Sequence, residues 1–250
     1  RPEDGTFLFT GELKDGELDM VPASLMNPGE VPWPRLRGLQ GQLTFDRLGM
    51  QLHEARALMG EGVQAVELKA DAVVIDDMTQ EPVLRVQAQS QADAPLLLGL
   101  VRQSPLNEML ASALQPAQAS GPVLTRFALQ LPLQDLSKSR VQGSVQFNGN
   151  DLRMLPGTPW LRKLNGTLTF NERGFEVRQL QATLLGGPAL IDGGMNTPEP
   201  VAGQTASKVA QTVLEARGRV SAAGLLAADD VAPLALLAQQ KDLELLAGDG

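Results

Sequence analysis

Apolar and polar residues alternate along most of this chain, and this alternation limits the possible folds more than any other feature. Val66, Leu68 and Ala70, for example, alternate with Glu67 and Lys69. The same period of two returns in residues 84–89, 123–133 and 141–147. Because successive side chains of a β-strand point to opposite faces, each stretch predicts a strand with one apolar and one polar face. Two-faced strands are typical of antiparallel sheets, whereas the strands of parallel sheets are apolar on both faces.

The alternating segments recur in two copies. The pattern of residues 41–52 returns 125 positions later in residues 166–177, where Gly166, Leu168, Phe170 and Gly174 match Gly41, Leu43, Phe45 and Gly49. Further upstream, residues 16–22 resemble residues 150–156 at an offset of 134 positions. Nearly the whole chain therefore consists of about two copies of one unit, and a repeated unit predicts a repetitive architecture.

We predict that the two units cover residues 1–120 and 121–250. Each unit contains one stretch with apolar residues at helical spacing, so we expect helical segments near residues 94–115 and 222–240. Residues 197–210 show no period and are predicted to form a long loop.

The parity of the apolar positions slips by one residue at the same place in both units. Apolar residues fall on even numbers up to Leu52 and on odd numbers from Ala55, and the second unit has the same slip between Val177 and Leu180. One extra residue that exchanges the faces of a strand is a β-bulge, and a bulge bends and twists its strand. The sequence therefore predicts a curved sheet.

The composition argues against several classes of function. The chain has 21 Lys and Arg against 29 Asp and Glu, and its net charge of −8 disfavours nucleic acids and anionic bilayer surfaces as partners. With no Cys and 1 His, it can form neither a disulfide nor a zinc site of Cys and His ligands. No apolar run approaches the roughly 18 to 20 residues that span a membrane. The chain begins at Arg1 and stops at Gly250 without a start Met, a signal peptide or a capping element, so we expect it to be part of a longer protein.

No residue pattern points to catalysis. His53 has Arg178 as its counterpart in the second unit and no Ser or Cys motif near it, so we interpret it as a solvent-exposed strand residue. Asp76 and Asp77 lack the spaced oxygen ligands of a calcium loop and are predicted to form a turn. We therefore expect a protein without enzymatic activity, cofactor or metal.

Two further groups of residues are interpreted as structural. Trp33 and Trp160 each follow a proline at the same place in their unit, and we predict that they anchor strand connections rather than contact a ligand. The glycine pairs at residues 186–187 and 193–194 are predicted to permit turns.

Several segments of the chain are similar to a known family. Residues 155–170 are followed by Gly174-Phe175 and by Gly186-Gly187-Pro188. Residues 97–114, which contain Ser104-Pro105-Leu106, are followed by Ser120-Gly121-Pro122 and by a strand that ends in Leu131-Pro132-Leu133. These segments resemble the AsmA-like proteins, and most closely their YhdP type from Gram-negative bacteria.

The resemblance implies a fold, a location and partners. The expected fold is mainly β, a curved antiparallel repeating β-groove of taco-like shape, built from about two units of about 125 residues that each hold one helical segment. The resemblance further implies a periplasmic protein that is anchored to the inner membrane and conducts phospholipids between the inner and outer membranes in the cell envelope. The expected partners are phospholipid acyl chains, with both membranes contacted through other parts of the protein. The family offers no catalytic residues.

The apolar face of such a sheet must be shielded from water, at about 25 cal/mol per Å² of apolar surface. The cover can be the second face of a closed sandwich or barrel, the helices, or acyl chains, and the resemblance favours acyl chains. The candidate residues of a lipid-binding groove all lie on the apolar side of the predicted strands. They are Leu43, Phe45, Met50, Leu52, Phe127, Leu129, Leu131, Val145, Phe147, Leu168, Phe170, Phe175 and Val177.

Two other functions stay open as alternatives. A non-catalytic structural or assembly scaffold of the cell envelope would bind proteins along exposed edge strands. A hydrolase of envelope polymers would need an Asp or Glu pair that faces a cleft at a separation of about 5 to 10 Å.

Overall fold

The computed structural model describes residues 7–19, 29, 31–62, 65–109, 114–135, 138–196, 211–221 and 224. These residues form mostly β-strands, with two short helices between the fifth and the sixth strand. The elements in chain order are β1 (Leu8–Leu18), β2 (Leu36–Asp46), β3 (Gly49–Met59), β4 (Val66–Ile75), β5 (Val83–Asp93), α1 (Ala94–Arg102), α2 (Leu106–Met109), β6 (Gln118–Ser120), β7 (Pro122–Pro132), β8 (Arg140–Arg153), β9 (Leu161–Asn171), β10 (Gly174–Leu184), β11 (Gly187–Asn196) and β12 (Gln211–Gly218). The prediction of a mainly β fold is confirmed.

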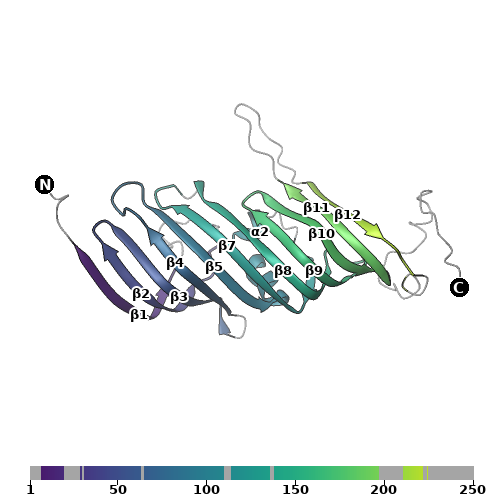
Figure 1. Ribbon diagram of the computed structural model, residues 1–250, viewed down its shortest axis with the longest axis horizontal. Helices are drawn as coiled ribbons and strands as arrows, with labels where there is room; N and C mark the ends of the chain where they lie inside the picture. Colours follow the sequence, from purple (N-terminus) through teal and green to yellow (C-terminus); the bar gives the residue numbers. More distant parts are fainter. Residues whose placement is uncertain are drawn as a thin grey trace, which may run out of the picture.

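One open antiparallel sheet contains all the described strands. They follow one another in the order β1-β2-β3-β4-β5-β7-β8-β9-β10-β11-β12, and the short β6 pairs with β8 off this path. Figure 1 shows the strands side by side along the longest dimension of the molecule, with β1 and β12 at opposite ends. Neighbouring strands in the sheet are also neighbours in sequence, except for β5 and β7, between which α1, α2 and β6 intervene. This is the arrangement expected of antiparallel strands that follow one another along the chain.

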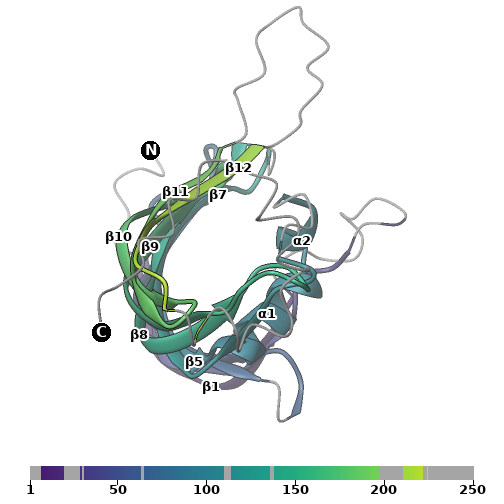
Figure 2. The ribbon, with the colours of Figure 1, turned by 90° about the vertical axis from the view of Figure 1, so that its right-hand side faces the viewer.

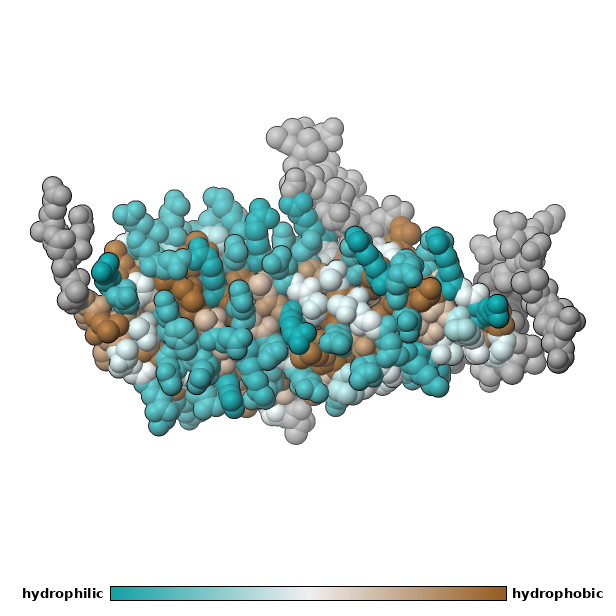
Figure 3. Space-filling model, in the orientation of Figure 1, coloured by the Kyte–Doolittle hydropathy of each residue, from teal (hydrophilic) through white to brown (hydrophobic). Residues whose placement is uncertain are grey.

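The pairing of the strands aligns their apolar sides. In β4, Val66 and Ala70 are 1% and 9% exposed, whereas Glu67 and Lys69 are exposed. Because cross-strand partners point to the same side, the apolar residues collect on one face of the sheet, which we call the inner face. Figure 2 shows that the sheet is strongly curved, with α1 and α2 on its concave side. The convex side, seen in Figure 3, is mostly hydrophilic, so the inner face is the concave one.

The curvature coincides with bulges in the strands. β3 has one residue more than β2 around Glu54, and β10 has one more than β9 around Gln179. Both residues have a left-handed backbone conformation, with φ of 50° and 51°. Gly38 and Lys163 have the same conformation at matching bulges in β2 and β9. The predicted bulges and the predicted curvature are confirmed, because an extra residue bends the strand that contains it.

The bulges of the two hairpins lie 125 residues apart in the chain, from Glu54 to Gln179 and from Gly38 to Lys163. The division of the whole chain into units 1–120 and 121–250 stays a prediction. The predicted loop at 197–210 lies outside the described residues, and of the predicted helical segment at 222–240 the structure describes Gly224 alone. The helical segment predicted near 94–115 is found as α1 and α2.

Two clusters of buried apolar residues lie next to the bulges. One cluster contains Leu164 and Leu180, at 0% and 3% exposure, which directly follow the bulge residues of β9 and β10. The other contains Leu52 and Ala55 on either side of the β3 bulge. The bend brings neighbouring side chains of the inner face together, and this packing excludes water from the bend.

α1 is fastened to the segment that leads into β6. The Arg102 side chain in the last turn of α1 donates hydrogen bonds to the carbonyl of Leu114, at 3.3 Å, and to the carbonyl of Ala117. Pro95 occupies the first turn, where its missing N–H costs no helical hydrogen bond. The helices therefore have a fixed place at the end of β5.

The turn predicted at residues 193–194 is wrong. Gly193 and Gly194 lie inside β11, between β10 and β12. A side chain at Gly194 would collide with the carbonyl oxygen of Phe175 in the neighbouring strand, so the pair permits close approach of backbones instead of a turn. The pair at residues 186–187 does stand at a turn, where Gly186 has a φ of 78° between β10 and β11.

Candidate functional site: the inner face of the sheet

The structure places all the candidate groove residues on the inner face. Leu43 and Leu52 lie opposite each other, and their cross-strand row runs on through β4 and β5 to Leu129 in β7. The next row joins Phe45 and Met50 to Leu131 in the same way. Residues from three separate hairpins thus form one surface.

The other half of the inner face continues from the same strand. A row runs from Phe127 in β7 through Gly143 in β8 to Phe170 and Phe175. The row beside it contains Val145, Leu168 and Val177. Phe147 packs against the buried cluster around Leu164. Because β7 supplies both Leu129 and Phe127, the two halves are continuous.

Most of this surface is only half covered. Leu52 and Val177 are buried, at 6% and 4% exposure, and the other candidate residues are half-buried. In a closed sandwich, residues in the middle of a strand would be covered by the facing sheet. No second sheet faces them in the part of the chain that the structure describes. The closed sandwich is therefore excluded for these strands.

Sequence reasoning missed the residues that connect the two halves. Val73 and Ile75 of β4 and Leu84 and Val86 of β5 complete the rows between β3 and β7. In β5, the alternation of Leu84 and Val86 with polar residues is the signal that would have found them. In β4 the register shifts after Ala70, so Val73 and Ile75 stand on the opposite parity from Ala70, and alternation alone would not have assigned them to the inner face. Met195, 4% exposed and opposite Phe175 in β11, extends the surface further.

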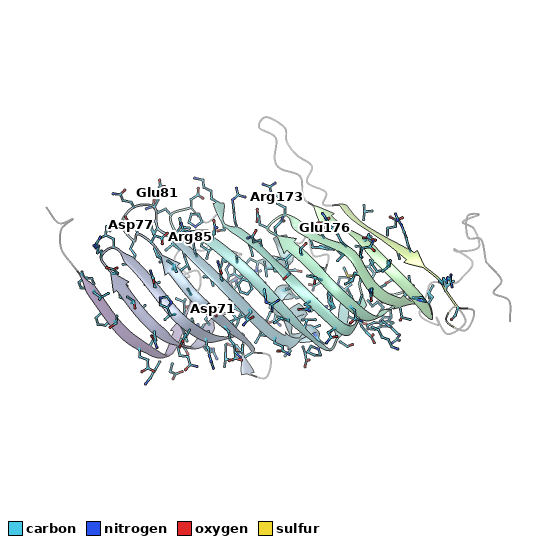
Figure 4. All side chains as sticks on the ribbon, viewed as in Figure 1. Asp71, Asp77, Glu81, Arg85, Arg173 and Glu176 are labelled. Carbon is cyan, nitrogen blue, oxygen red and sulfur yellow. The ribbon has the colours of Figure 1, made fainter. Side chains whose placement is uncertain are left out.

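The inner-face rows carry no charged residue in the described strands. The charges stand on the outer face, where a row runs from Lys69 through Arg126 to Glu176 by way of uncharged polar residues. Figure 4 shows Asp71, Arg85 and Glu176 on this convex side. The two faces therefore differ in chemistry: hydrocarbon within the curve and polar groups outside it.

Ion pairs along the strands stabilise the charges of the outer face. Arg178 donates to Glu176 at 2.7 Å, and this hydrogen bond raises the pKa of the Arg178 guanidinium. Arg217 donates to Glu215 at 2.9 Å, which lowers the pKa of that carboxyl. Pairs of this kind keep the outer face charged and hydrated at neutral pH, although exposed ion pairs contribute little to stability.

A shallow hollow of about 1260 Å³ follows the outer row across the sheet. Outer-face residues around it include Lys69, Asp71, Arg126 and Glu176, and residues of the inner row such as Phe127, Phe170 and Phe175 also line it. A lining that includes charged side chains suits hydrocarbon less well than the uncharged inner-face rows do. The inner face, and not this hollow, is the candidate site for apolar ligands.

α1 adds apolar residues on the concave side. Its sequence from Ala94 to Val101 contains no polar side chain, and Leu96, Leu97, Leu98 and Leu100 are all half-buried. A helix that is apolar all round is normally buried on every side. α1 contacts β5, β6 and α2 among the described elements, so part of its apolar surface stays open.

The tryptophans stand in strand connections, as predicted. Trp33 precedes β2 and Trp160 precedes β9, and both are half-buried. The guanidinium groups of Arg153 and Arg162 lie 4.9 and 5.8 Å from the ring centroid of Trp160. These cation–π contacts tie the ends of β8 and β9 together.

The residues weighed for catalysis have structural surroundings. His53 is exposed and hydrogen-bonds Gln51 at 3.0 Å. Asp77 accepts hydrogen bonds from the hydroxyl and the N–H of Thr79 and from the N–H of Gln80, and these bonds lower the pKa of its carboxyl. The predicted turn at Asp77 is confirmed. Within the described ranges, no group of three or more His, Cys, Asp or Glu residues could hold a metal ion.

No helix of the described part of the chain is long and apolar enough to cross a membrane. A protein-family model described as "YhdP protein" matches residues 1–235 of the 250 in the chain. The match spans every described strand and helix. No curated protein and no solved structure matches the chain.

Proposed function

The chain belongs to the YhdP family, and on this premise we propose that it is a segment of a bridge-like protein that conducts phospholipids along its inner face. In this proposal the acyl chains lie against the concave side of the sheet and cover the apolar surface that protein leaves open. The observation that carries the proposal is the continuity of an uncharged, half-exposed apolar surface from β2 to β11.

The dimensions of the surface suit hydrocarbon chains. Eleven strands follow one another in the sheet, and a spacing of about 4.8 Å gives the inner face a length of roughly 50 Å. Strands of 11 residues, such as β7 and β9, span about 36 Å along their path around the curve. Each CH₂ group that leaves water for this surface contributes about 0.8 kcal/mol, so a whole acyl chain binds favourably.

The distribution of charge supports a cargo with one apolar and one polar part. The inner-face rows offer nothing to a charged headgroup, whereas solvent and the polar rims of the sheet do. We propose that the headgroup stays at the open side of the curve while the acyl chains lie inside. A charged group on the inner face would cost about 3 kcal/mol against hydrocarbon, which keeps headgroups out.

Location and partners follow from the family and are proposals for this chain. We place the segment in the periplasm, within a protein anchored to the inner membrane that reaches the outer membrane through other regions. We also propose that the segment is not an enzyme and needs no cofactor, since its candidate site consists of hydrocarbon side chains.

Lipid content of the purified chain tests the proposal. Leu129 on the inner face and Gln130 on the outer face are neighbours in β7, so Leu129→Glu and Gln130→Glu form a matched pair. We expect phospholipid to copurify with the wild type and with Gln130→Glu, and to be almost lost from Leu129→Glu, because about 3 kcal/mol corresponds to roughly a hundredfold in affinity. Native mass spectrometry measures bound lipid, and thermal melting identifies any variant that fails to fold. Wild-type protein that purifies without lipid would refute the proposal.

A structural scaffold is the second candidate function, and one observation favours it. The edge strand β1 is exposed along nearly its whole length, with Leu8 and Phe9 at 69% and 51% exposure. Exposed strand edges bind other strands readily. A scaffold predicts bound protein in place of bound lipid in the same measurement.

A further inference from the structure

The first three strands of the sheet and the strands β8 to β10 share one pairing register. In β1, Leu13, Gly16 and Leu18 pair with Gly41, Leu39 and Leu36. In β8, Phe147, Asn150 and Leu152 pair with Gly166, Leu164 and Leu161. Each of these β1 residues has its equivalent in β8, 134 positions later, and each of the β2 residues has its equivalent in β9, 125 positions later. The register shifts of the β1–β2 pair and of the β8–β9 pair fall at equivalent residues. β1 and β8 are therefore equivalent strands in two equivalent sets.

The equivalent strands differ on their other edge. β8 pairs there with β7, from Leu124 opposite Gln146 to Gln130 opposite Arg140. The corresponding edge of β1 is the end of the sheet, and none of the described residues pairs with it. Its stretch from Leu8 to Gly11 carries no charge, no proline and no bulge, which are the features that normally protect an edge strand.

Hydrogen bonds at the turn between β2 and β3 show which backbone groups face the free edge. The carbonyl of Phe7 accepts the N–H of Arg47 at 2.8 Å, as the carbonyl of the equivalent Val141 accepts the N–H of Glu172 at 3.1 Å. Residues of a strand alternate between its two neighbours. Phe7 and Phe9 therefore bond toward β2, and the N–H groups of Leu8, Thr10 and Glu12 point to the free edge.

We infer that the free edge of β1 is a docking edge for one extended, antiparallel strand of the β7 type. In the β7–β8 pair, Phe127 lies opposite Gly143 and Thr125 opposite Val145. At the equivalent positions of β1 the docked strand faces Phe9 and Gly11, so the large and the small residue of this edge are exchanged relative to β8. The inner side of the docked strand is uncharged. The docked strand lengthens the inner face by one row, and the inference does not depend on what that face carries.

A synthetic peptide with the sequence of residues 122–132 tests the inference on the whole chain. Thr10→Pro removes the outward N–H without removing a bond to β2, and proline is tolerated at such edge positions. Thr10→Val is the matched variant that keeps the N–H. We expect fluorescence anisotropy to show saturable binding of the labelled peptide to the wild type and to Thr10→Val, and binding about tenfold weaker to Thr10→Pro. Equal binding to the two variants would overturn the inference.

Modified peptides give a second test that changes nothing in the protein. In the β7–β8 pair, Arg126 and Ala128 face Ser144 and Gln142, whose N–H groups point to β7. A peptide N-methylated at Arg126 and Ala128 should lose binding, and one N-methylated at Phe127 and Leu129 should keep it. Equal affinity of the two peptides would contradict the inference. Self-association of the protein without peptide, if Thr10→Pro abolishes it, would also contradict the inference, because it would assign the edge to a second copy of the chain.

Discussion

Asn150 shows how one polar side chain fixes the place where β8 exchanges partners. It is 2% exposed, and its amide nitrogen donates to the carbonyls of Ser120 and Pro122, each at 2.9 Å. Its oxygen accepts the N–H of Asn148 at 2.8 Å. These bonds satisfy the backbone groups on either side of Gly121, where β6 ends and β7 begins. A buried polar group is stabilising only when all its partners are present.

Replacing Asn150 should therefore be costly. Asn150→Ala leaves two carbonyls and one N–H without their partner, and we expect a loss of about 3 kcal/mol in the free energy of unfolding. Asn148→Ala is the control, because its exposed side chain plays no part in these bonds and its change should stay within about 0.5 kcal/mol. Urea denaturation measures both. Equal stability of the two variants would show that the Asn150 bonds do not hold the strand exchange together.

At the scale of residues, the sequence allows the face of each side chain to be predicted, but not its neighbours. Phe170 and Leu168 could be assigned to the inner face because alternation within one strand is a local property. Their partners depend on register between strands, which one sequence does not specify when strands are apolar on the same parity. The glycines at 193–194 were misjudged for the same reason, since only the backbones of β10 and β12 explain them.

At the scale of elements, the bulges shape the strands, and they do so with residues in an unfavourable conformation. Glu54 and Gln179 have a positive φ, which costs a residue with a side chain about 1 kcal/mol or more relative to glycine. The bulge is kept because the residues after it, such as Ala55 and Leu180, are buried on the inner face. A strand without the extra residue would turn these side chains to the outer face.

Substitutions at Glu54 test this role of the bulge. We expect Glu54→Val to lower the free energy of unfolding by about 2 kcal/mol, because β-branched residues rarely adopt a positive φ, and Glu54→Gly to raise it by up to about 1 kcal/mol. Arg56→Val, at an exposed position of the same strand, is the control and should change stability little, since valine favours strands. Thermal unfolding ranks the three variants. A ranking in which Glu54→Val matches Arg56→Val would contradict the assignment of the bend to Glu54.

The position of the helices could not be predicted from the sequence. Apolar residues at helical spacing predicted a helical segment near 94–115, and α1 and α2 confirm it. A helix with a polar face would have shown which side it turns to solvent. α1 is apolar all round, so its place on the concave side depends on tertiary contacts such as those of Arg102.

At the scale of the whole molecule, the sheet curves without closing. Alternation and bulges predict strands and curvature, but they are equally compatible with a barrel, a sandwich or an open groove. The pairing of the described strands shows that they form one open sheet, with β1 and β12 at its two ends. Among the described strands the charged side chains stand outside the inner-face rows, and the inner face keeps its apolar character from β2 to β11.

If acyl chains occupy the space inside the curve, photo-crosslinking from two adjacent residues of β9 will detect them. Phe170 points to the inner face and Thr169 to the outer face, so a photo-reactive side chain at each position samples one face of the same strand. We expect adducts with phospholipid from position 170 and none from position 169. Protein adducts from position 170, or lipid adducts in equal yield from both positions, would contradict this expectation.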